Sequence, residues 1–324
     1  MIDLRAAIVE RGAQLASAKD PTSPGDLLSL LRLLYETGRE DLPLGSLFEG
    51  HVDAVQIVTR YGTQAQRNTL SKALASHSAL GVWNAELSGE PLLLRNGQLT
   101  GGKSFASGAG ILSHALVTAE HEGGRQLILL DLAKAPPVID RTFWRVVGMQ
   151  RSETHIVRWQ DVSVSPDALI GMPGDYVREP WFSGGALRFT AVQAGGIAAL
   201  LDGTRDHLTA VGRSGDPHQS GRLAALFALA QAASSAVRAA ASAWFLSETT
   251  RLPMVAAARD AVYQAGGEAL RIAQEAVGAQ ALFVDHPLSA TIADLSMYLR
   301  QPAPDMQRMN VGAAVAAGTL RAAL

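Results

Sequence analysis

The chain has 324 residues, and 28 lysine and arginine residues nearly balance 30 aspartate and glutamate residues, for a formal net charge of −2. A chain without a strong basic excess lacks the surface on which nucleic-acid binding depends, so we expect no nucleic-acid partner. The absence of cysteine excludes disulfides, thiolate catalysis and cysteine-ligated metal centres. Hydrophobic residues make up 48% of the chain, which suffices for a large core.

The N-terminal stretch "MIDLRAAIVERGAQ" is charged and amphipathic, unlike a secretory signal. No run reaches the roughly 18 uncharged apolar residues of a membrane span. We therefore expect a cytoplasmic protein with no membrane association.

Residues 1–80 have the pattern of a helical domain, which is short. "PGDLLSLLRLLYETGRE" places apolar residues at helical spacing, and "EGHVDAVQIVTRYGT" repeats the pattern before Gly62, which is a typical helix stop. The apolar positions are Leu27, Leu28, Leu31, Leu34 and Tyr35 in the first run and Val52, Val55, Val58 and Tyr61 in the second.

Residues 81–178 change character, because glycines separate short apolar runs. "RNGQ" predicts a tight turn, since Asn-Gly adopts positive φ at low cost, and "EHEGGRQLILLDL" predicts a hairpin around Gly123 and Gly124. No strand–helix–strand rhythm is present. The segment therefore predicts an antiparallel β domain.

Residues 179–324 return to helix and are rich in alanine. A helix is expected over 186–211, and two long apolar stripes follow, over 223–244 and 255–276. Long helices lined with small residues pack closely, as in a four-helix bundle. The complete order predicts an α+β fold with an N-terminal helical domain, a middle β domain and a C-terminal bundle.

Common site motifs are missing from the sequence. It has no Gly-rich dinucleotide fingerprint after a strand, no Walker loop and no nucleophile elbow. The eight histidines form no metal-binding pair on a helix face, and His51 and His286 fit local structural or surface groups better than ligands. We expect no metal site.

Two segments, in this order, resemble elements of the acyl-CoA dehydrogenase family: "LTGGKSFASGAG" and "GMQRSETHIVRWQDVSVSPDALIG". The resemblance runs from about Leu44 to about Pro304. It implies the same helix–β–helix architecture, and it implies that FAD lies between the β domain and the bundle. Since flavin sites in this family are completed across subunits, it also implies a homodimer or homotetramer.

The resemblance assigns four flavin contacts to the β domain. "VWNAE" is similar to the family's first flavin-facing strand, so Trp83 and Asn84 are candidate contacts, although a buried tryptophan beside a turn asparagine would explain them too. "FAS" is similar to the element where an aromatic ring packs on the flavin and a hydroxyl bonds to it. Phe105 and Ser107 are the candidates there, against simple β-domain packing.

Two further candidates come from the helical part. Arg213 in "VGRSGDPHQSGR" resembles the arginine that reaches the FAD diphosphate, a role that suits a bidentate guanidinium, or else it is a surface charge at a helix end. Gly278 in "EAVGAQALF" resembles the first of two paired glycines near the adenosine half. Ala279 replaces the second glycine, and Glu275 stands where the family has a glutamine.

The catalytic base of the family is missing at both familiar places. Counting along "ADLSMYLRQPAPD", the expected glutamate falls on Pro302, which has no side-chain acceptor, and the alternative position in the bundle falls on Arg188, which cannot act as a base at neutral pH. Asp305 fits a helix cap better than a displaced base. The catalytic residues therefore stay unassigned.

These observations favour an FAD-dependent oxidoreductase that acts on the CH–CH group of an acyl-CoA-like small molecule, with an altered or missing base. A flavin-dependent monooxygenase on the same scaffold is the alternative, because it needs no base for an α-proton. A non-catalytic family member is a third hypothesis.

Overall fold

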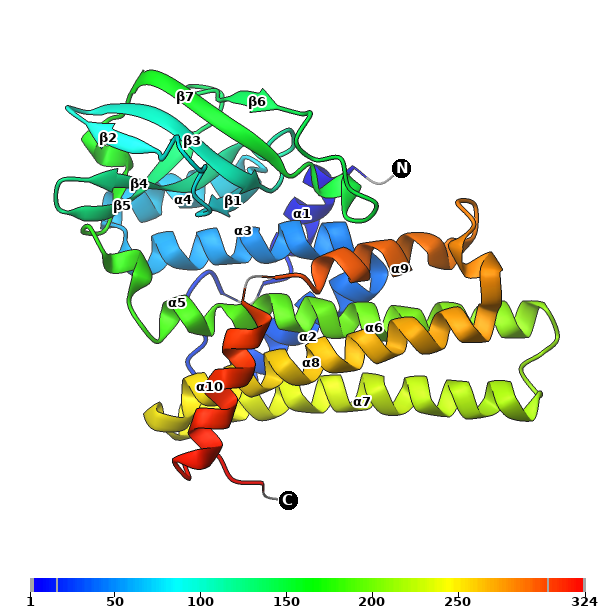
Figure 1. The fold of residues 1–324 in the computed structure, drawn as a ribbon. Helices are drawn as coiled ribbons and strands as arrows, with labels where there is room; N and C mark the ends of the chain where they lie inside the picture. Colours follow the sequence, from blue (N-terminus) through cyan, green and yellow to red (C-terminus); the bar gives the residue numbers. More distant parts are fainter. Residues whose placement is uncertain (1–2, 16, 302, 323–324) are drawn as a thin grey trace. The chain divides into compact units, whose positions relative to one another are not determined.

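The computed structural model describes residues 3–15, 17–301 and 303–322. Its elements follow the order helices, strands, helices (Figure 1). The first helices are α1 (Leu4–Gly12), α2 (Pro24–Glu40), α3 (Leu42–Tyr61) and α4 (Gln64–Ala75). The strands are β1 (Leu80–Trp83), β2 (Leu93–Arg95), β3 (Gln98–Ala106), β4 (His114–His121), β5 (Gly124–Asp131), β6 (Val138–Asp140), β7 (His155–Ser163) and β8 (Leu169–Ile170). The last helices are α5 (Trp181–Gly184), α6 (Ala186–Ala210), α7 (Pro217–Leu246), α8 (Glu248–Val277), α9 (Pro287–Tyr298) and α10 (Pro304–Ala316).

Several helices begin at capping residues that are visible in the sequence. The Ser23 hydroxyl accepts the Asp26 amide at the start of α2, and Thr63 forms a reciprocal capping box with Gln66 at the start of α4. The Asp216 carboxylate caps α7 by accepting two backbone N–H groups of its first turn. These side chains satisfy amides that a helix leaves unpaired at its N-terminus.

Contacts between residues divide the chain into two compact units. The first contains Met1–Pro21, Ser46–Val146 and Gln150–Phe182, and the second contains Thr22–Gly45, Val147–Met149 and Ser183–Leu324. The change from helices to strands and back falls near residues 80 and 178, as the sequence predicts. As domain borders, these two positions stay predictions.

The β region of the first unit is one mixed sheet with the strand order β6-β7-β3-β2-β4-β5-β8, and β1 pairs with β4. Most pairs are antiparallel, but β1–β4 and β2–β4 are parallel. The expectation of an antiparallel domain therefore holds for the hairpins and misses these two pairings. The predicted turns are confirmed: Asn96 (φ 50°) and Gly97 (φ 73°) join β2 to β3, and the Gly123–Gly124 region joins β4 to β5.

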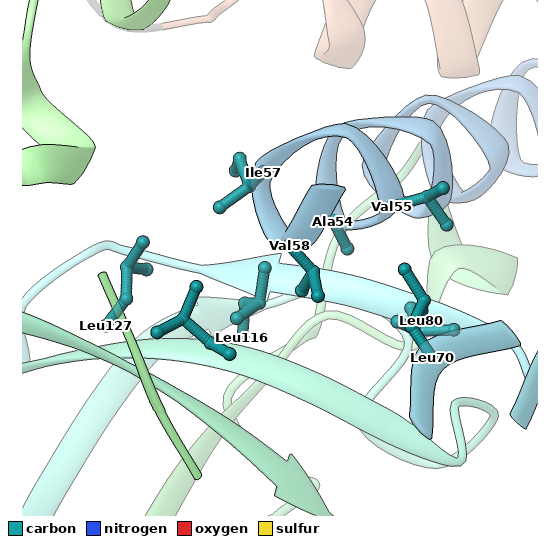
Figure 2. Close-up of a cluster of buried hydrophobic side chains, with 9 residues drawn as sticks. Ala54, Val55, Ile57, Val58, Leu70, Leu80, Leu116 and Leu127 are labelled. Carbon is teal, nitrogen blue, oxygen red and sulfur yellow. The ribbon is translucent and has the colours of Figure 1, made fainter. Parts of the chain in front are cut away.

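The core of the first unit lies between α3 and the sheet (Figure 2). Figure 2 shows Val58 on the face of α3 that points toward Leu116 of β4 and Leu80 of β1. Val58, Leu116 and Leu80 are each 0% exposed. This burial explains the helical spacing of apolar residues in the third helix, since each buried aliphatic side chain contributes roughly 1.5–3 kcal/mol.

The second unit is a helical bundle in which α6, α7 and α8 run side by side and α2 packs on α6 (Figure 1). Small residues allow the close approach: a Cβ on Gly195 would lie 2.0 Å from the Tyr35 carbonyl oxygen. An ion pair also joins α2 to α6, because Arg39 Nε lies 2.7 Å from the Asp202 carboxylate. The helix expected over 186–211 and both long stripes are confirmed as α6, α7 and α8.

Among the described residues, two helical segments have the length and hydropathy of a membrane span, Trp181–Ala210 and Pro217–Leu246. Such helices are weak evidence for a membrane protein, because core helices pass the same test; the most apolar window is 61% buried in the first segment and 28% buried in the second.

Candidate flavin-contacting site

Phe105 lies near the end of β3 with its ring on the surface of the first unit. Its side chain is 54% exposed, and its backbone has a positive φ of 50°, which is uncommon for an aromatic residue. The ring packs edge-on against Phe143 at 5.2 Å and Trp144 at 6.4 Å between centroids. An exposed aromatic group of this kind offers apolar surface to a planar ligand.

Ser107 stands two residues further and is held from two sides. Its carbonyl oxygen accepts the Trp83 indole N–H at 2.8 Å, and its hydroxyl oxygen accepts the Thr154 hydroxyl at 3.0 Å. Thr154 is in turn 2.7 Å from the Ser152 hydroxyl. Because Ser107 Oγ acts as acceptor in this chain, its own hydroxyl hydrogen stays available to an acceptor on a ligand.

Trp83 and Asn84 have different environments. The Trp83 indole is 1% exposed and packs near Trp159 at 6.2 Å, so it belongs to the β-domain interior, and only its backbone could contact a ligand. Asn84 Oδ1 accepts the Thr118 hydroxyl at 3.1 Å. Among the described residues the Asn84 amide nitrogen has no partner, which leaves two N–H donors free.

A buried lysine, Lys103, binds the Asn84 backbone by a hydrogen bond. The Lys103 ammonium is fully buried and donates to Thr118 at 2.9 Å, to Glu86 at 2.9 Å and to the Asn84 carbonyl at 3.3 Å. Burial lowers the pKa of Lys103, and the hydrogen bond to Glu86 opposes that effect. The network therefore fixes the segment that carries Asn84.

The segment "RSETH" borders Ser107; it belongs to the second stretch that resembles the family, but the resemblance assigned none of its residues a role. Glu153 there accepts Arg141 at 2.7 Å, and its Oε2 lies 2.9 Å from His155 Nε2. His155 Nδ1 is buried and has no hydrogen-bond partner in the described part of the chain. Four consecutive polar residues, 151–154, precede the strand in the sequence. Only the pairing of β3 with β7 shows that they lie near Ser107.

Arg213 and Gly278 lie in the second unit, at one end of the bundle. Arg213 follows α6, is half exposed, and approaches Asp216 at 3.5 Å, while Gly278 ends α8 with φ 77°. Gln219 of α7 donates to the Ala276 carbonyl at 3.2 Å and so joins the two helix ends. A Cβ on Gly278 would meet nothing within 4 Å, so space around this backbone is open.

A small pocket in the second unit is lined by Gln301, which precedes the expected base position in the sequence. Pro302 itself lies outside the described residues. Its neighbour Gln301 lines the pocket together with Phe189 of α6 and with Arg259 and Asp260 of α8. The Asp260 carboxylate is already engaged, by Arg308 at 3.3 Å and by Gln264 at 2.9 Å.

Three further charged residues were considered for the catalytic base or lie near its expected position: Arg188, Asp305 and Arg259. Arg188 lies in the first turn of α6, and Asp305 lies in the first turn of α10 with its side chain 91% exposed. Asp305 does not occupy the cap position, which belongs to Ala303. The guanidinium of Arg259 lies over the Phe189 ring at 5.0 Å, and burial lowers its pKa. Arg259 was not predicted as a site residue, although it stands as an arginine within an alanine-rich apolar stripe of the sequence.

The hydrogen-bond donors and the aromatic ring of three β-domain residues, Asn84, Phe105 and Ser107, fit a flavin. The free hydroxyl hydrogen of Ser107, the free amide of Asn84 and the exposed ring of Phe105 match a planar aromatic molecule with an edge of hydrogen-bond acceptors. Trp83 joins the segments of Asn84 and Ser107 through its indole bond.

Comparison with solved structures defines the class: the chain has an acyl-CoA dehydrogenase-like fold. No family model matches the sequence, and no curated protein matches it significantly. TdsC from Paenibacillus sp. A11-2, a dibenzothiophene monooxygenase solved with FMN and indole, shares 17% identity with a TM-score of 0.78, over 98% of this chain and 96% of its own.

Two other structures extend the likeness to different activities. Butyryl-CoA dehydrogenase from Megasphaera elsdenii shares 17% identity with a TM-score of 0.78, over 97% of this chain and 87% of its own. KijD3, solved with FMN and a dTDP-linked keto sugar, shares 18% identity with a TM-score of 0.77, over 98% of this chain and 86% of its own.

Proposed function

We propose that the protein is a flavin-dependent oxidoreductase. The observation that carries the proposal is the free donor pair of Asn84 and Ser107 beside the exposed Phe105 ring, on a fold whose solved examples include flavin complexes. A bound flavin supplies two-electron oxidation and reduction. The chain's own part is to orient that ring and to bind the substrate.

The three residues have distinct roles in this proposal. Asn84 donates to the acceptor edge of the ring system, and Lys103 and Thr118 keep it in place. Ser107 donates its hydroxyl hydrogen to a flavin nitrogen or phosphate oxygen. Phe105 covers apolar ring surface.

The form of flavin that we propose is FAD, and residues at one end of the bundle support it. FAD requires a site for its adenosine half, and the half-exposed Arg213 with the open backbone at Gly278 supports FAD. FMN is the competing form, because TdsC and KijD3 were solved with FMN. Chromatography of the flavin released by heat distinguishes the two.

The substrate we propose is an acyl-CoA-like small molecule oxidised at its CH–CH group. That reaction needs a base for the α-proton. The carboxylate beside Gln301, Asp260, is paired with Arg308, and this observation favours a second candidate, oxygen-dependent monooxygenation of a small molecule.

We further propose a cytoplasmic homodimer or homotetramer. Large apolar side chains stand exposed on two bundle helices, including Phe227 of α7 (58% exposed) and Met309 of α10 (73% exposed). Such side chains are commonly covered by a second copy of the chain. Light scattering at micromolar concentration measures the stoichiometry.

Purification followed by two reactions tests the function. A yellow protein with about one flavin per chain is expected, and a colourless protein that does not bind added FMN or FAD would contradict the proposal. Anaerobic bleaching by an acyl-CoA identifies the dehydrogenase. Transfer of an oxygen atom from O₂ to an added small molecule by the protein with reduced flavin, without bleaching by any acyl-CoA, identifies the monooxygenase, since reduced flavin alone also consumes oxygen.

A variant pair tests the residues. Ser107→Ala removes one hydrogen bond to the flavin, so its flavin Kd should rise about 5- to 10-fold. Ser88→Ala is the matched control, because Ser88 lies exposed in the same domain. Equal affinity of the two variants would remove Ser107 from the site.

A further inference from the structure

A second cavity lies in the first unit, away from the residues of the flavin proposal. It has a volume of about 820 Å³, is partly open, and is lined by α1 and the residues that follow it, by α3, by the end of α4 and by the loop 76–78. Its walls are largely apolar, with Val9, Leu15, Val55 and Leu74 among them. Sites for small molecules usually measure roughly 300–1,000 Å³, so this cavity has the size of one.

Two buried polar side chains line this cavity, those of His51 and Ser78. His51 of α3 is 2% exposed and lines the cavity, and its Nδ1 accepts the Leu80 N–H at 3.1 Å. Because an amide N–H can only donate, Nδ1 must be unprotonated, and the neutral ring carries its hydrogen on Nε2. Burial keeps the ring neutral by lowering its pKa to about 4.

The Nε2–H group of His51 has no hydrogen-bond partner among the residues that the structure describes. The nearest part of α1 is Gly12, where a Cβ would lie only 3.0 Å from Nε2. Glycine therefore leaves room for an atom to approach the donor. The donor opens on the cavity, so an acceptor on a bound molecule can take the place of water as its hydrogen-bond partner.

Charge at the cavity mouth indicates what kind of molecule would enter. Asp3, Arg5 and Glu10 are exposed charged residues on α1 and its cap, of both signs. The Asp3 carboxylate already accepts two backbone N–H groups as the cap of α1. A rim of mixed charge and the neutral groups inside, the His51 ring and the Ser78 hydroxyl, do not compensate a buried ionic charge, which favours an uncharged ligand.

We propose that this cavity binds a small, uncharged, largely apolar molecule that carries one hydrogen-bond acceptor, and that His51 Nε2–H donates to that acceptor. The cavity shares no residue with the site of Asn84, Phe105 and Ser107. The proposal therefore goes beyond the proposed function and does not depend on it.

A pair of isosteric probes tests it. Acetophenone carries a carbonyl oxygen where α-methylstyrene carries a CH₂ group. Titration of the full chain, with methyl NMR of Leu15, Val55 and Leu74 as the readout, gives a Kd for each probe at this cavity. Because acetophenone loses carbonyl hydration on binding, the hydrogen bond is measured against a variant without the donor: the ratio of the acetophenone Kd to the α-methylstyrene Kd should be about 5- to 10-fold lower in the unaltered protein.

Variants locate the effect. His51→Asn retains an acceptor for the Leu80 amide, but its shorter side chain places no donor at the position of Nε2, so the ratio of the acetophenone Kd to the α-methylstyrene Kd should rise about 5- to 10-fold. Gly12→Ala places a methyl group beside Nε2 and should weaken acetophenone binding, whereas Gly50→Ala on α3, whose Cβ meets nothing within 4 Å, should not. Methyl signals unaffected by either probe, or a Kd ratio unchanged in His51→Asn, would overturn the proposal.

Discussion

Lowering the pH from 7 to 5 should reduce the free energy of unfolding, because the fold requires a neutral His51. Burial lowers the pKa of this imidazole from 6.5 to about 4. Protonation would also remove the acceptor that Nδ1 offers to the Leu80 amide. The unfolded chain has no such restriction, and its histidines titrate near 6.5.

The sign and size follow from the two pKa values. Between pH 6.5 and 4 the unfolded chain binds the proton more readily than the folded chain. The stabilisation is therefore complete above pH 6.5 and is lost as the pH falls toward 4. The gap corresponds to roughly 3 kcal/mol in full, of which about 2 kcal/mol is lost by pH 5.

Urea unfolding at pH 7 and pH 5 measures this loss against a variant. His51→Asn keeps an acceptor for Leu80 but does not titrate, so its stability should fall by about 2 kcal/mol less than that of the unaltered protein. His121→Asn is the control, since the exposed His121 ring also accepts a backbone N–H. Equal losses in the unaltered protein and in His51→Asn would refute the reasoning.

Three further predictions concern packing and turns, and urea unfolding measures each. Gly195→Ala should destabilise the bundle by about 1–3 kcal/mol, since its Cβ would lie 2.0 Å from the Tyr35 carbonyl. Leu116→Ala removes a fully buried side chain and should cost about 3–5 kcal/mol. Gly97→Ala should cost about 1 kcal/mol, because φ is 73° there, whereas Gly50→Ala in α3 should stabilise by about 0.5–1 kcal/mol.

Each of these has a result that would contradict it. An unchanged midpoint for Gly195→Ala would mean that α2 and α6 do not approach closely. A loss below about 1 kcal/mol for Leu116→Ala would place that residue outside a packed core. Equal effects of the Gly97 and Gly50 substitutions would contradict the different backbone conformations at these two glycines.

The candidate site could be predicted only in part. The motif resemblance indicated Asn84, Phe105 and Ser107, and the structure shows free donors on Asn84 and Ser107 and an exposed ring on Phe105. It places the Trp83 indole inside the domain instead. The contact of Thr154 with Ser107 was not predicted, because the two residues are 47 positions apart in the sequence.

Local patterns determined the elements of this protein by themselves. Helical spacing predicted α6, α7 and α8, and Asn96-Gly97 predicted the β2–β3 turn, because side-chain periodicity and turn φ values depend on neighbouring residues alone. Only the tertiary structure decided the parallel pairing of β1 with β4. Only the tertiary structure shows that His51, which the sequence indicated as a local structural or surface residue, is buried and lines a cavity. Burial and long-range pairing depend on segments distant in sequence, which local spacing does not encode.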